Sequence, residues 1–314
     1  MHVTSLLSVL PRLQQQALST KGERFFCDVP DPDLLETGFS GSLRVIQGEE
    51  VHVHDWQCWV DVASLLECRL QTPECLENGW LRLWFLPLDT NDSWHRLPVS
   101  DPTEKYGMGT PFFELDKLEE PHFQTELREG IEGLNLQPGE RILILGAHKG
   151  DEIRLLEEVV GPELFAALEV VAVDHCFSAV EVGRQRWREQ PQVTWHCMDL
   201  HDVVGLGEHT YALVIAVGTL QSPEVRDREL LKWLVKEGSQ ERNALLIGFP
   251  NSRYVQGALK YGAEMKNYAT SEGSLLLKEL SYYKRFLQQQ RYRVRVKGKY
   301  YQFVMAYRSL RQGL

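Results

Sequence analysis

Glycines and acids that could hold a polar ligand follow short apolar runs in the second half of the chain. Residues 142–145 are all apolar and lead into Gly146, and Gly150 follows four residues later, before acids and a leucine-rich stretch. An apolar run that ends at glycine is typical of a buried parallel strand, and the residues after Gly150 are typical of a helix start. Small residues at such a turn let the backbone approach a bound ligand.

Two later apolar runs end near acids, Asp174 and Asp199. In a doubly wound sheet the ligand lies beyond the carboxyl ends of the strands, so these carboxylates are expected close to the glycine loop, residues 146–150. Asp174 follows Gly150 by 24 residues, about where a nucleotide fold has the carboxylate that binds the ribose hydroxyls. Asp199 is spaced to reach the edge of an adenine ring. One such acid alone is often only a turn residue, but their order and spacing together predict a nucleotide site.

An alternation of strands and helices must position these groups. Because each expected strand is apolar on both sides, the economical arrangement is an α/β domain with a doubly wound, mostly parallel sheet and helices on both faces. Alternating residues around Gly298 predict a final antiparallel hairpin. The expected strands cover residues 142–145, 168–173, 193–197, 213–217 and 244–249, and the expected helices cover residues 151–158, 178–188, 223–236 and 274–290.

The first hundred residues predict a smaller domain. Residues 1–20 have leucines at helical spacing, while residues 41–97 consist of strand-like pieces, among them residues 51–62. The residues that follow are rich in proline, glycine and charge, which is typical of a linker. The expected division is a β-rich or α+β accessory domain over residues 1–100, a linker over 101–121 and the larger domain over 122–314.

Composition limits the partners and the compartment. The formal net charge of −10 disfavours a protein whose main role is to wrap nucleic acid. Residues 284–314 nevertheless carry nine Lys/Arg and no acid, so this basic end could serve an anionic substrate such as tRNA or form a solvated strand surface. Six cysteines without a C-x-x-C pair, no signal peptide and no apolar run of about 20 residues predict a cytoplasmic protein that does not enter a membrane. The oligomeric state is open, a homodimer included.

No metal site is predicted. His52 and His54 are two residues apart on an expected strand and so point the same way, with Cys58 close in sequence. A structural metal site needs a third and a fourth ligand, and none follows at a convincing spacing.

The chain from about residue 122 to 310 resembles the class I S-adenosylmethionine-dependent methyltransferases. The resemblance rests on LQPGERILILGAHKGDE, VVAVDHCFSAVEVGRQR, VTWHCMDL and YALVIAVGTLQS, and on the terminal hairpin, the usual ending of that family's seven-stranded sheet. It implies S-adenosylmethionine as the cofactor and methyl transfer as the reaction. The implied cofactor residues are Gly146, Ala147, His148 and Gly150 at the methionine end, Asp174 with His175 at the ribose, Asp199 with Leu200 at the adenine, and Val217 with Gly218 on the methyl-donating side.

Two positions of the glycine loop depart from the family pattern. The family usually has an acid two residues before the first glycine and glycine at alternate positions, whereas this chain has Ile144 and His148 there. The missing acid leaves the cofactor amino group without its usual counter-charge, which Asp151 or Glu152 could supply. His148 and Lys149 could contact a phosphate or the substrate, or could simply face solvent.

The acceptor side is less clearly marked. GTLQS, residues 218–222, lacks the Asn/Asp-Pro-Pro-aromatic signature of methylation at exocyclic amines of bases or at glutamine. The connection over residues 250–273 is too long for a minimal turn, so it is the expected substrate loop, with a solvated crossover as the alternative. Its substrate candidates are Asn251, Arg253 and Lys260, of which Arg253 and Lys260 would bind an anionic group. Tyr254 or Tyr261 is the candidate catalytic residue, with Lys266, Asn267 and Tyr268 further along.

Two functions follow from these patterns. The first is a methyltransferase that acts on an unidentified acceptor, a small molecule in preference to tRNA or protein. The second is a non-catalytic protein that binds S-adenosylmethionine and has a regulatory role, which the irregular glycine loop favours.

Overall fold

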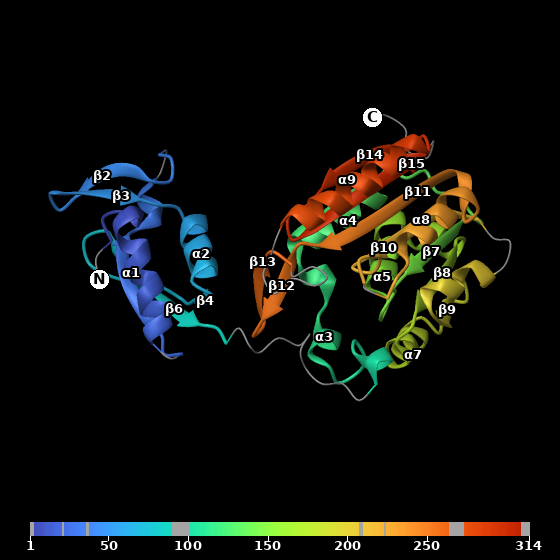
Figure 1. The fold of residues 1–314 in the computed structure, drawn as a ribbon, viewed down its shortest axis with the longest axis horizontal. Coiled ribbons are helices and arrows are strands. Elements are labelled where there is room, and N and C mark those ends of the chain that lie inside the picture. Colours follow the sequence, from blue (N-terminus) through green and yellow to red (C-terminus); the bar gives the residue numbers. More distant parts are fainter. Residues whose placement is uncertain are drawn as a thin grey trace. The chain divides into compact units, whose positions relative to one another are not determined.

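The computed structural model describes residues 3–20, 22–35, 38–89, 101–206, 210–222, 224–263 and 273–308 (Figure 1). The chain divides into two compact units. The first consists of Met1–Arg96 and Tyr254–Lys260, and the second of Leu97–Arg253 and Tyr261–Leu314. None of the helices in the described ranges has the length and apolar composition needed to cross a bilayer.

The first unit is a mixed α+β fold around a small antiparallel sheet. Strands β1, β4 and β5 each pair with β6, while β2 and β3 form a separate hairpin. The bounds, with η for a 3-10 helix, are α1 Leu6–Ser19, β1 Phe25–Pro30, η1 Pro32–Leu35, β2 Ser42–Ile46, β3 Glu49–Val53, α2 Trp56–Leu65, β4 Cys68–Leu70, β5 Glu74–Cys75 and β6 Trp80–Pro87.

One expected strand of this unit is wrong, because the second part of residues 51–62 forms helix α2. Asp55 precedes the helix in an extended conformation, and its side chain accepts a hydrogen bond from the Cys58 backbone N–H at 2.7 Å. Trp59, Val62 and Ala63 are buried at helical spacing. An N-cap aspartate followed by this spacing specifies a helix, which the aromatic and β-branched composition obscured.

The second unit is built on a seven-stranded sheet with the order β14-β15-β11-β10-β7-β8-β9. Neighbours from β11 to β9 are parallel, while β15 is antiparallel to both β11 and β14. This confirms the predicted α/β class, the mostly parallel sheet and the antiparallel C-terminal hairpin. The strands are β7 Arg141–Leu145, β8 Glu169–Asp174, β9 Val193–Cys197, β10 Tyr211–Val217, β11 Ser239–Pro250, β14 Arg293–Lys297 and β15 Tyr301–Arg308.

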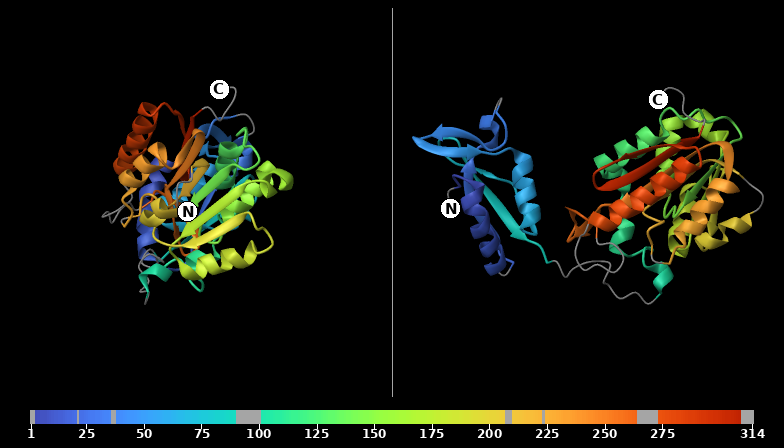
Figure 2. Two further views of the ribbon diagram at one scale, coloured as in Figure 1. Left: turned by 90° about the vertical axis from the view of Figure 1, so that its right-hand side faces the viewer. Right: turned by 45° about the horizontal axis from the view of Figure 1, so that its top comes forward.

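Helices cover both faces of this sheet, which Figure 2 shows between two helical layers. One apolar cluster joins α4, α5, α6 and α7 to one face, and a second joins η5, α8 and α9 to the other. Alternate residues of β7 enter the two clusters, so this strand is apolar throughout residues 142–145. The helices are η3 Pro102–Glu104, α3 Pro111–Glu114, η4 Lys117–Glu119, α4 Pro121–Ile131, α5 Asp151–Val160, α6 Pro162–Ala166, α7 Phe177–Arg186, η5 Leu200–Leu206, α8 Asp227–Lys236 and α9 Gly273–Gln289.

The connection after β11 is more regular than expected. Strands β12 (Ser252–Val255) and β13 (Ala258–Tyr261) form a two-stranded sheet joined by Gln256 and Gly257, both with positive φ. The predicted loop is therefore a hairpin over the first half of its length. Three residues grouped with the substrate candidates lie outside the described residues: Lys266, Asn267 and Tyr268.

Gly183 of α7 offers a test of the packing between this helix and β9. A Cβ at residue 183 would lie 2.4–2.7 Å from three ring atoms of Trp195. We expect Gly183→Ala to lower the free energy of unfolding by about 1–3 kcal/mol, because the cost of overpacking exceeds the roughly 1 kcal/mol gain in helix propensity. Gln185→Ala, on the exposed side of α7, is the control and should change stability by less than about 0.5 kcal/mol. Chemical denaturation measures both, and equal midpoints for the Gly183 variant and the wild type would contradict the packing.

Candidate functional site

The carboxyl ends of the parallel strands bring the predicted cofactor residues to one edge of the sheet. Gly146 and Ala147 follow β7, and their backbone N–H groups both donate to the carbonyl oxygen of Val173 in β8, at 2.8 and 3.0 Å. The first two strand ends are therefore joined directly. The ends of β8, β9 and β10 place at the same edge Asp174, His175, Asp199, Leu200, Val217 and Gly218.

Asp174 holds the glycine loop to the end of β8. Its Oδ2 accepts a hydrogen bond from the His148 backbone N–H, and its Oδ1 accepts one from the Cys176 backbone N–H, each at 2.8 Å. The His175 ring nitrogen Nδ1 lies 3.7 Å from the same Oδ1. Each carboxylate oxygen has two acceptor positions, so this largely buried side chain can still accept from ligand hydroxyls.

His148 takes the place of a family glycine in a conformation that glycine favours. Its φ of 47° lies in the left-handed region, which histidine visits more readily than most residues. Its Nε2 donates to the carbonyl oxygen of Tyr106 at 2.8 Å, and its ring lies edge-on to Phe112 and Phe113. Burial lowers the pKa of the ring, which is therefore neutral at pH 7. The His148 side chain therefore contacts the protein and does not simply face solvent.

Residues 104–116, called the cover segment below, pack against this edge. The sequence predicted a linker over residues 101–121. In the structure, residues 101–121 belong to the second unit and contain η3, α3 and η4. The Glu104 carboxylate accepts hydrogen bonds from the Ser178 backbone N–H and hydroxyl at the start of α7, at 3.1 and 2.5 Å. Polar residues that suggest a solvated linker are used here in contacts with the sheet edge.

Lys149 anchors the cover segment to the glycine loop. The residue is 8% exposed, and its ammonium donates to the carbonyl oxygens of Phe113 and Leu115 at 2.6 and 2.8 Å. Arg154 of α5 donates to both carboxylate oxygens of Asp116, at 2.8 and 2.7 Å. The Lys149 side chain therefore neither faces solvent nor extends toward a ligand phosphate.

Gly146 and Gly150 are required by packing within the protein. Both have positive φ, 69° and 87°. A Cβ at residue 146 would lie 2.1 Å from Thr219 Oγ1, and a Cβ at residue 150 would lie 2.8 Å from Trp187 Nε1. The small residues predicted for ligand approach thus also let the loop pack against its own neighbours.

Asp199 is a charged acceptor exposed at the edge. Its Oδ1 accepts from the backbone N–H of His201 at 2.8 Å and from the ring Nδ1–H of the same residue at 2.6 Å. His201 Nε2 accepts in turn from the Arg226 backbone N–H at 2.9 Å, which places the ring proton on Nδ1. The backbone hydrogen bond holds the pKa of Asp199 below its usual range. The Asp199 side chain is 61% exposed, while Leu200 is buried beside it.

Tyr301 is the first residue of β15 and lies beside the end of β10, although no sequence motif marks it. Its hydroxyl is 3.6 Å from the position that a Cβ on Gly218 would occupy. The charges of Lys117, Glu120 and Glu152 act on this phenol, and burial raises its pKa. The antiparallel pairing of β15 with β11, which sets residue 301 opposite Pro250, brings it to this edge.

Glu152, in the first turn of α5, is a buried carboxyl without a partner on another residue. The residue is 9% exposed, its side chain accepts a hydrogen bond from its own backbone N–H, and it makes no hydrogen bond or ion pair with any other described residue. Burial raises the pKa of Glu152 to about 8, and the negative charges of Asp151 and Asp174 act in the same direction. At neutral pH this carboxyl is therefore mostly protonated.

Comparison with known proteins finds similarity to solved structures. No protein-family model matches the sequence, and no curated protein sequence matches it either. It is similar to the solved structure of a SAM-dependent methyltransferase from Aquifex aeolicus, with 16% identity over 61% of this chain and 97% of that chain and a TM-score of 0.40. Precorrin-6y C5,15-methyltransferase from Geobacter metallireducens GS-15 has 12% identity, over 59% and 89%, with a TM-score of 0.40. An O-methyltransferase family protein from Burkholderia thailandensis has 12% identity, over 59% and 56%, with a TM-score of 0.42.

The topology of the sheet decides the fold. Strand β7 is central, β8 and β9 lie on one side of it, β10 and β11 on the other, and antiparallel β15 separates β11 from β14. Plain dinucleotide-binding folds have a parallel sixth strand in place of this hairpin. The second unit has the class I methyltransferase fold.

In this methyltransferase fold the predicted substrate residues have partners within the protein. The buried Asn251 donates from its side-chain amide to the Lys299 carbonyl oxygen at 3.0 Å. Arg253 donates from Nη1 to the carbonyl oxygens of Tyr261 and Gly262, at 3.2 and 2.7 Å. These contacts hold the start of the β12–β13 hairpin, and a substrate role for these side chains stays a prediction.

The other candidates of that connection are divided between the two units. Tyr254 and Lys260 belong to the first unit, where the buried Lys260 ammonium donates to the Cys68 carbonyl oxygen at 3.0 Å. Tyr261 belongs to the second unit and is 60% exposed. The five candidates therefore do not form a single cluster within either unit.

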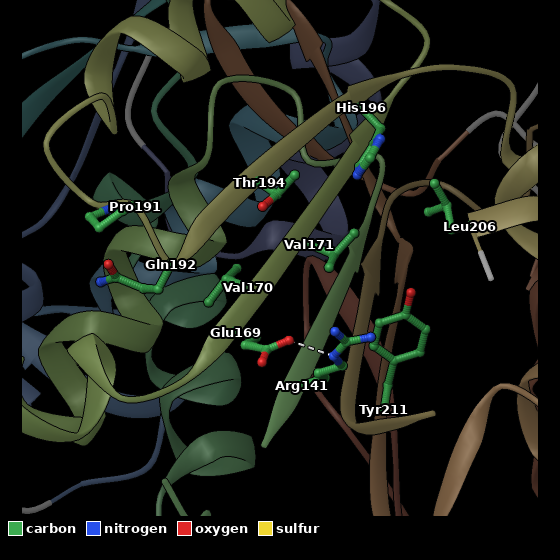
Figure 3. Close-up of a pocket in the computed structure, with 10 residues that line it drawn as sticks. All are labelled: Arg141, Glu169, Val170, Val171, Pro191, Gln192, Thr194, His196, Leu206 and Tyr211. Atoms are coloured by element: carbon green, nitrogen blue, oxygen red, sulfur yellow. Dashed lines mark hydrogen bonds and ion pairs between the residues drawn. The ribbon is translucent and has the colours of Figure 1, made fainter. Parts of the chain in front are cut away.

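A hollow of about 380 Å³ opens at the opposite edge of the methyltransferase sheet (Figure 3). Its lining includes the first residues of three strands, Arg141, Glu169 and Tyr211, and Arg141 Nε lies 2.5 Å from Glu169 Oε2. Because these are the amino ends of the strands, the hollow is separate from the glycine loop. We assign the candidate site to the carboxyl edge, where the charged acceptors lie.

The two histidines near the N-terminus have structural partners. His52 Nδ1 hydrogen-bonds with the Gly41 carbonyl oxygen at 2.8 Å, and the His54 ring lies edge-on to Trp59. Within the described ranges, no group of three or more His, Cys, Asp and Glu side chains is arranged to hold a metal ion.

The Glu152 carboxyl predicts a pH dependence of stability. Its pKa of about 8 in the folded protein exceeds the roughly 4.3 of an unfolded glutamate, so stability falls as pH rises through this range. Glu152→Gln cannot ionise, and we expect it to gain stability relative to the wild type by on the order of several kcal/mol between pH 5 and pH 9. Urea denaturation at a series of pH values measures this difference. Glu158→Gln, an exposed residue of α5 paired with Arg128, is the control. A difference between Glu152→Gln and wild type that does not change with pH would contradict the assignment.

Proposed function

We propose that the second unit binds S-adenosylmethionine and transfers its methyl group to a small-molecule acceptor. The observation that carries the proposal is that one edge of a sheet with this topology collects the glycine loop, Asp174 and Asp199. In the resembling family these places contact the methionine end, the ribose and the adenine of the cofactor.

The chemistry of the edge fits the parts of this cofactor. Asp174 and Asp199 are charged acceptors for the ribose hydroxyls and the adenine amino group, and hydrogen bonds to charged acceptors are the stronger ones. Glu152 is an acid beside the loop, which suits a positively charged aminoacyl group. When bound, the cofactor supplies an activated methyl group on a sulfonium centre. The protein then has to orient the acceptor in line with that group.

Tyr301 is the best-placed side chain for orienting the acceptor. Its hydroxyl lies beside Gly218, on the side where the resemblance places the methyl group. Because burial raises its pKa, the phenol stays protonated and donates a hydrogen bond to the acceptor rather than acting as a base. We therefore prefer Tyr301 to Tyr254 and Tyr261 as the acceptor-side tyrosine.

The charge distribution favours a small acceptor over tRNA. In the basic C-terminal end, Arg295 and Lys297 both pair with Glu129. Arg308 donates to the carbonyl oxygens of Gln240 and Glu241. Because Arg295 and Lys297 are already neutralised by Glu129, they would release fewer counterions from a phosphate backbone and so add less to nucleic-acid affinity.

A non-catalytic protein that binds S-adenosylmethionine is the second candidate. The observation that favours it is the cover segment, which engages His148 and Lys149 of the glycine loop through backbone carbonyls. In that case the cofactor binds and no methyl group is transferred.

Binding of the cofactor is testable at Asp199. Asp199→Asn keeps an acceptor oxygen for the His201 backbone but loses the charge and one acceptor toward adenine. We expect it to weaken S-adenosylmethionine binding about tenfold, the equivalent of about 1.4 kcal/mol, as measured by isothermal titration calorimetry. Asp202→Asn, at an exposed position of η5, is the control and should bind like the wild type. No heat of binding and no thermal shift with either S-adenosylmethionine or its demethylated product would refute the proposal.

The acceptor class is testable by label transfer. We expect the wild-type protein, given methyl-labelled S-adenosylmethionine and a cell extract divided into small molecules, tRNA and protein, to label the small-molecule fraction. Label in the tRNA fraction, lost at higher salt, would identify the basic end as a substrate surface instead. Cofactor binding without label in any fraction would favour the non-catalytic candidate.

A further inference from the structure

Glu152 differs from the other buried acids of this unit because no other described residue donates a hydrogen bond to it or pairs with it, and its only donor is its own backbone N–H. Asp174 accepts from two backbone N–H groups, Asp151 lies 3.4 Å from the guanidinium of Arg186, and the Glu120 carboxylate lies 2.6 Å from the ammonium of Lys117. A buried carboxyl that accepts only from its own backbone N–H leaves most of its acceptor positions unused, which is costly to the folded protein. Such a group points to a partner that binds from outside the chain.

The position of Glu152 is at the candidate ligand edge. It lies in the first turn of α5, two residues after Gly150, and α5 has ten residues. Its carboxyl is close enough to Asp174 at the end of β8 and to Tyr301 at the start of β15 for their charges to interact. The partial positive charge of a helix N-terminus favours an anion here, so an ionised Glu152 would have support on the protein side.

The charges around Glu152 favour a cationic partner. Asp151 on α5 and Asp174 on β8 both oppose its ionisation. Two cations of the neighbourhood are engaged elsewhere, because the Lys149 ammonium donates to the carbonyls of Phe113 and Leu115, and Arg186 lies against Asp151 and the Lys149 carbonyl. On the η4 side, Lys117 and Glu120 pair with each other and lie near Tyr301. A positively charged ligand group would therefore find an unneutralised acid here.

Ile144 explains why the acid lies on the helix and not on the strand. Where the resemblance expects an acid, Ile144 is 1% exposed and packs in the apolar cluster between the sheet and α4–α7. A carboxylate at that position would lack partners in this cluster. The first acids after the glycine loop are Asp151 and Glu152, in the first turn of α5.

We propose that Glu152 binds the ammonium group of the aminoacyl part of S-adenosylmethionine and releases its proton to solvent when it does so. This rests on the proposed function and assigns the counter-charge within that site. Without ligand the carboxyl is protonated at neutral pH, and the bound cation favours its ionised form. Binding is thus coupled to the loss of one proton, and affinity rises by close to tenfold per pH unit up to about pH 8.

Calorimetry with three ligands tests this coupling. S-adenosylhomocysteine carries the ammonium without the sulfonium charge, and 5′-methylthioadenosine lacks the aminoacyl part. Titrations at pH 7 in two buffers of different ionisation heat measure proton release directly. We expect the wild type to release close to one proton on binding S-adenosylmethionine or S-adenosylhomocysteine and none on binding 5′-methylthioadenosine. Glu152→Gln should weaken the first two at least tenfold, abolish the proton release and leave 5′-methylthioadenosine unchanged.

Controls separate the possible failures. Glu158→Gln on the exposed side of α5 should titrate like the wild type, and thermal melting establishes that Glu152→Gln is folded. If Glu152→Gln binds S-adenosylhomocysteine as the wild type does, with the same proton release, the assignment of Glu152 is wrong while cofactor binding stands. If Glu152→Gln weakens all three ligands equally, Glu152 shapes the whole site and does not bind the ammonium. If the wild type binds neither S-adenosylmethionine nor S-adenosylhomocysteine, the proposed function is wrong and this assignment falls with it.

Discussion

Two hydrogen bonds to Asp174 hold the candidate site together, and its other features depend on them. The carboxylate receives one N–H from each of the first two strand-to-helix turns, at His148 and Cys176. A carboxylate that accepts backbone N–H groups forms strong bonds, and here they hold His148 in its left-handed conformation. That backbone in turn presents the imidazole to the Tyr106 carbonyl and the Lys149 ammonium to the cover segment. Asp174 therefore links the glycine loop, and through it the cover segment, to the end of β8.

Burial of β7 on both faces determines where charge can appear at this edge. Residues 142–145 enter two apolar clusters, so the part of the strand that leads to this edge offers no polar position. The acids proposed to bind the ligand lie where the strands end or just beyond, at Asp174, Asp199 and the first turn of α5. These are also the places where a ligand can approach without disrupting the core. The separation of a dry sheet from a charged rim is thus a consequence of the doubly wound architecture.

Local sequence patterns predict most of the second unit, because the parallel strands β7, β8 and β10 are largely apolar runs that a glycine or an acid ends. The errors have a different origin, in contacts between residues distant in sequence. Glu104 and Asp116 look like linker residues until Ser178 and Arg154 are placed beside them. Tyr301 looks like one more residue of a hairpin, since only the pairing of β15 with β11 brings it to the site. Helix α2 is the exception. Its N-cap Asp55 and its helical spacing are local signals, but the aromatic composition of the segment favoured the prediction of a strand.

The two departures from the family pattern do not have the character of a site in decay. His148 has the left-handed backbone conformation that glycine favours, and its N–H donates to Asp174. At position 152 a glutamine would fill the same space and could not ionise, so it would suit a protein without a ligand better than the glutamate does. A buried carboxyl without a partner on another residue costs stability in the free protein, and polar groups of this kind are concentrated at functional sites, where a ligand offsets the cost. The same physical cost that makes Glu152 anomalous in the free protein therefore argues that this edge binds a positively charged ligand.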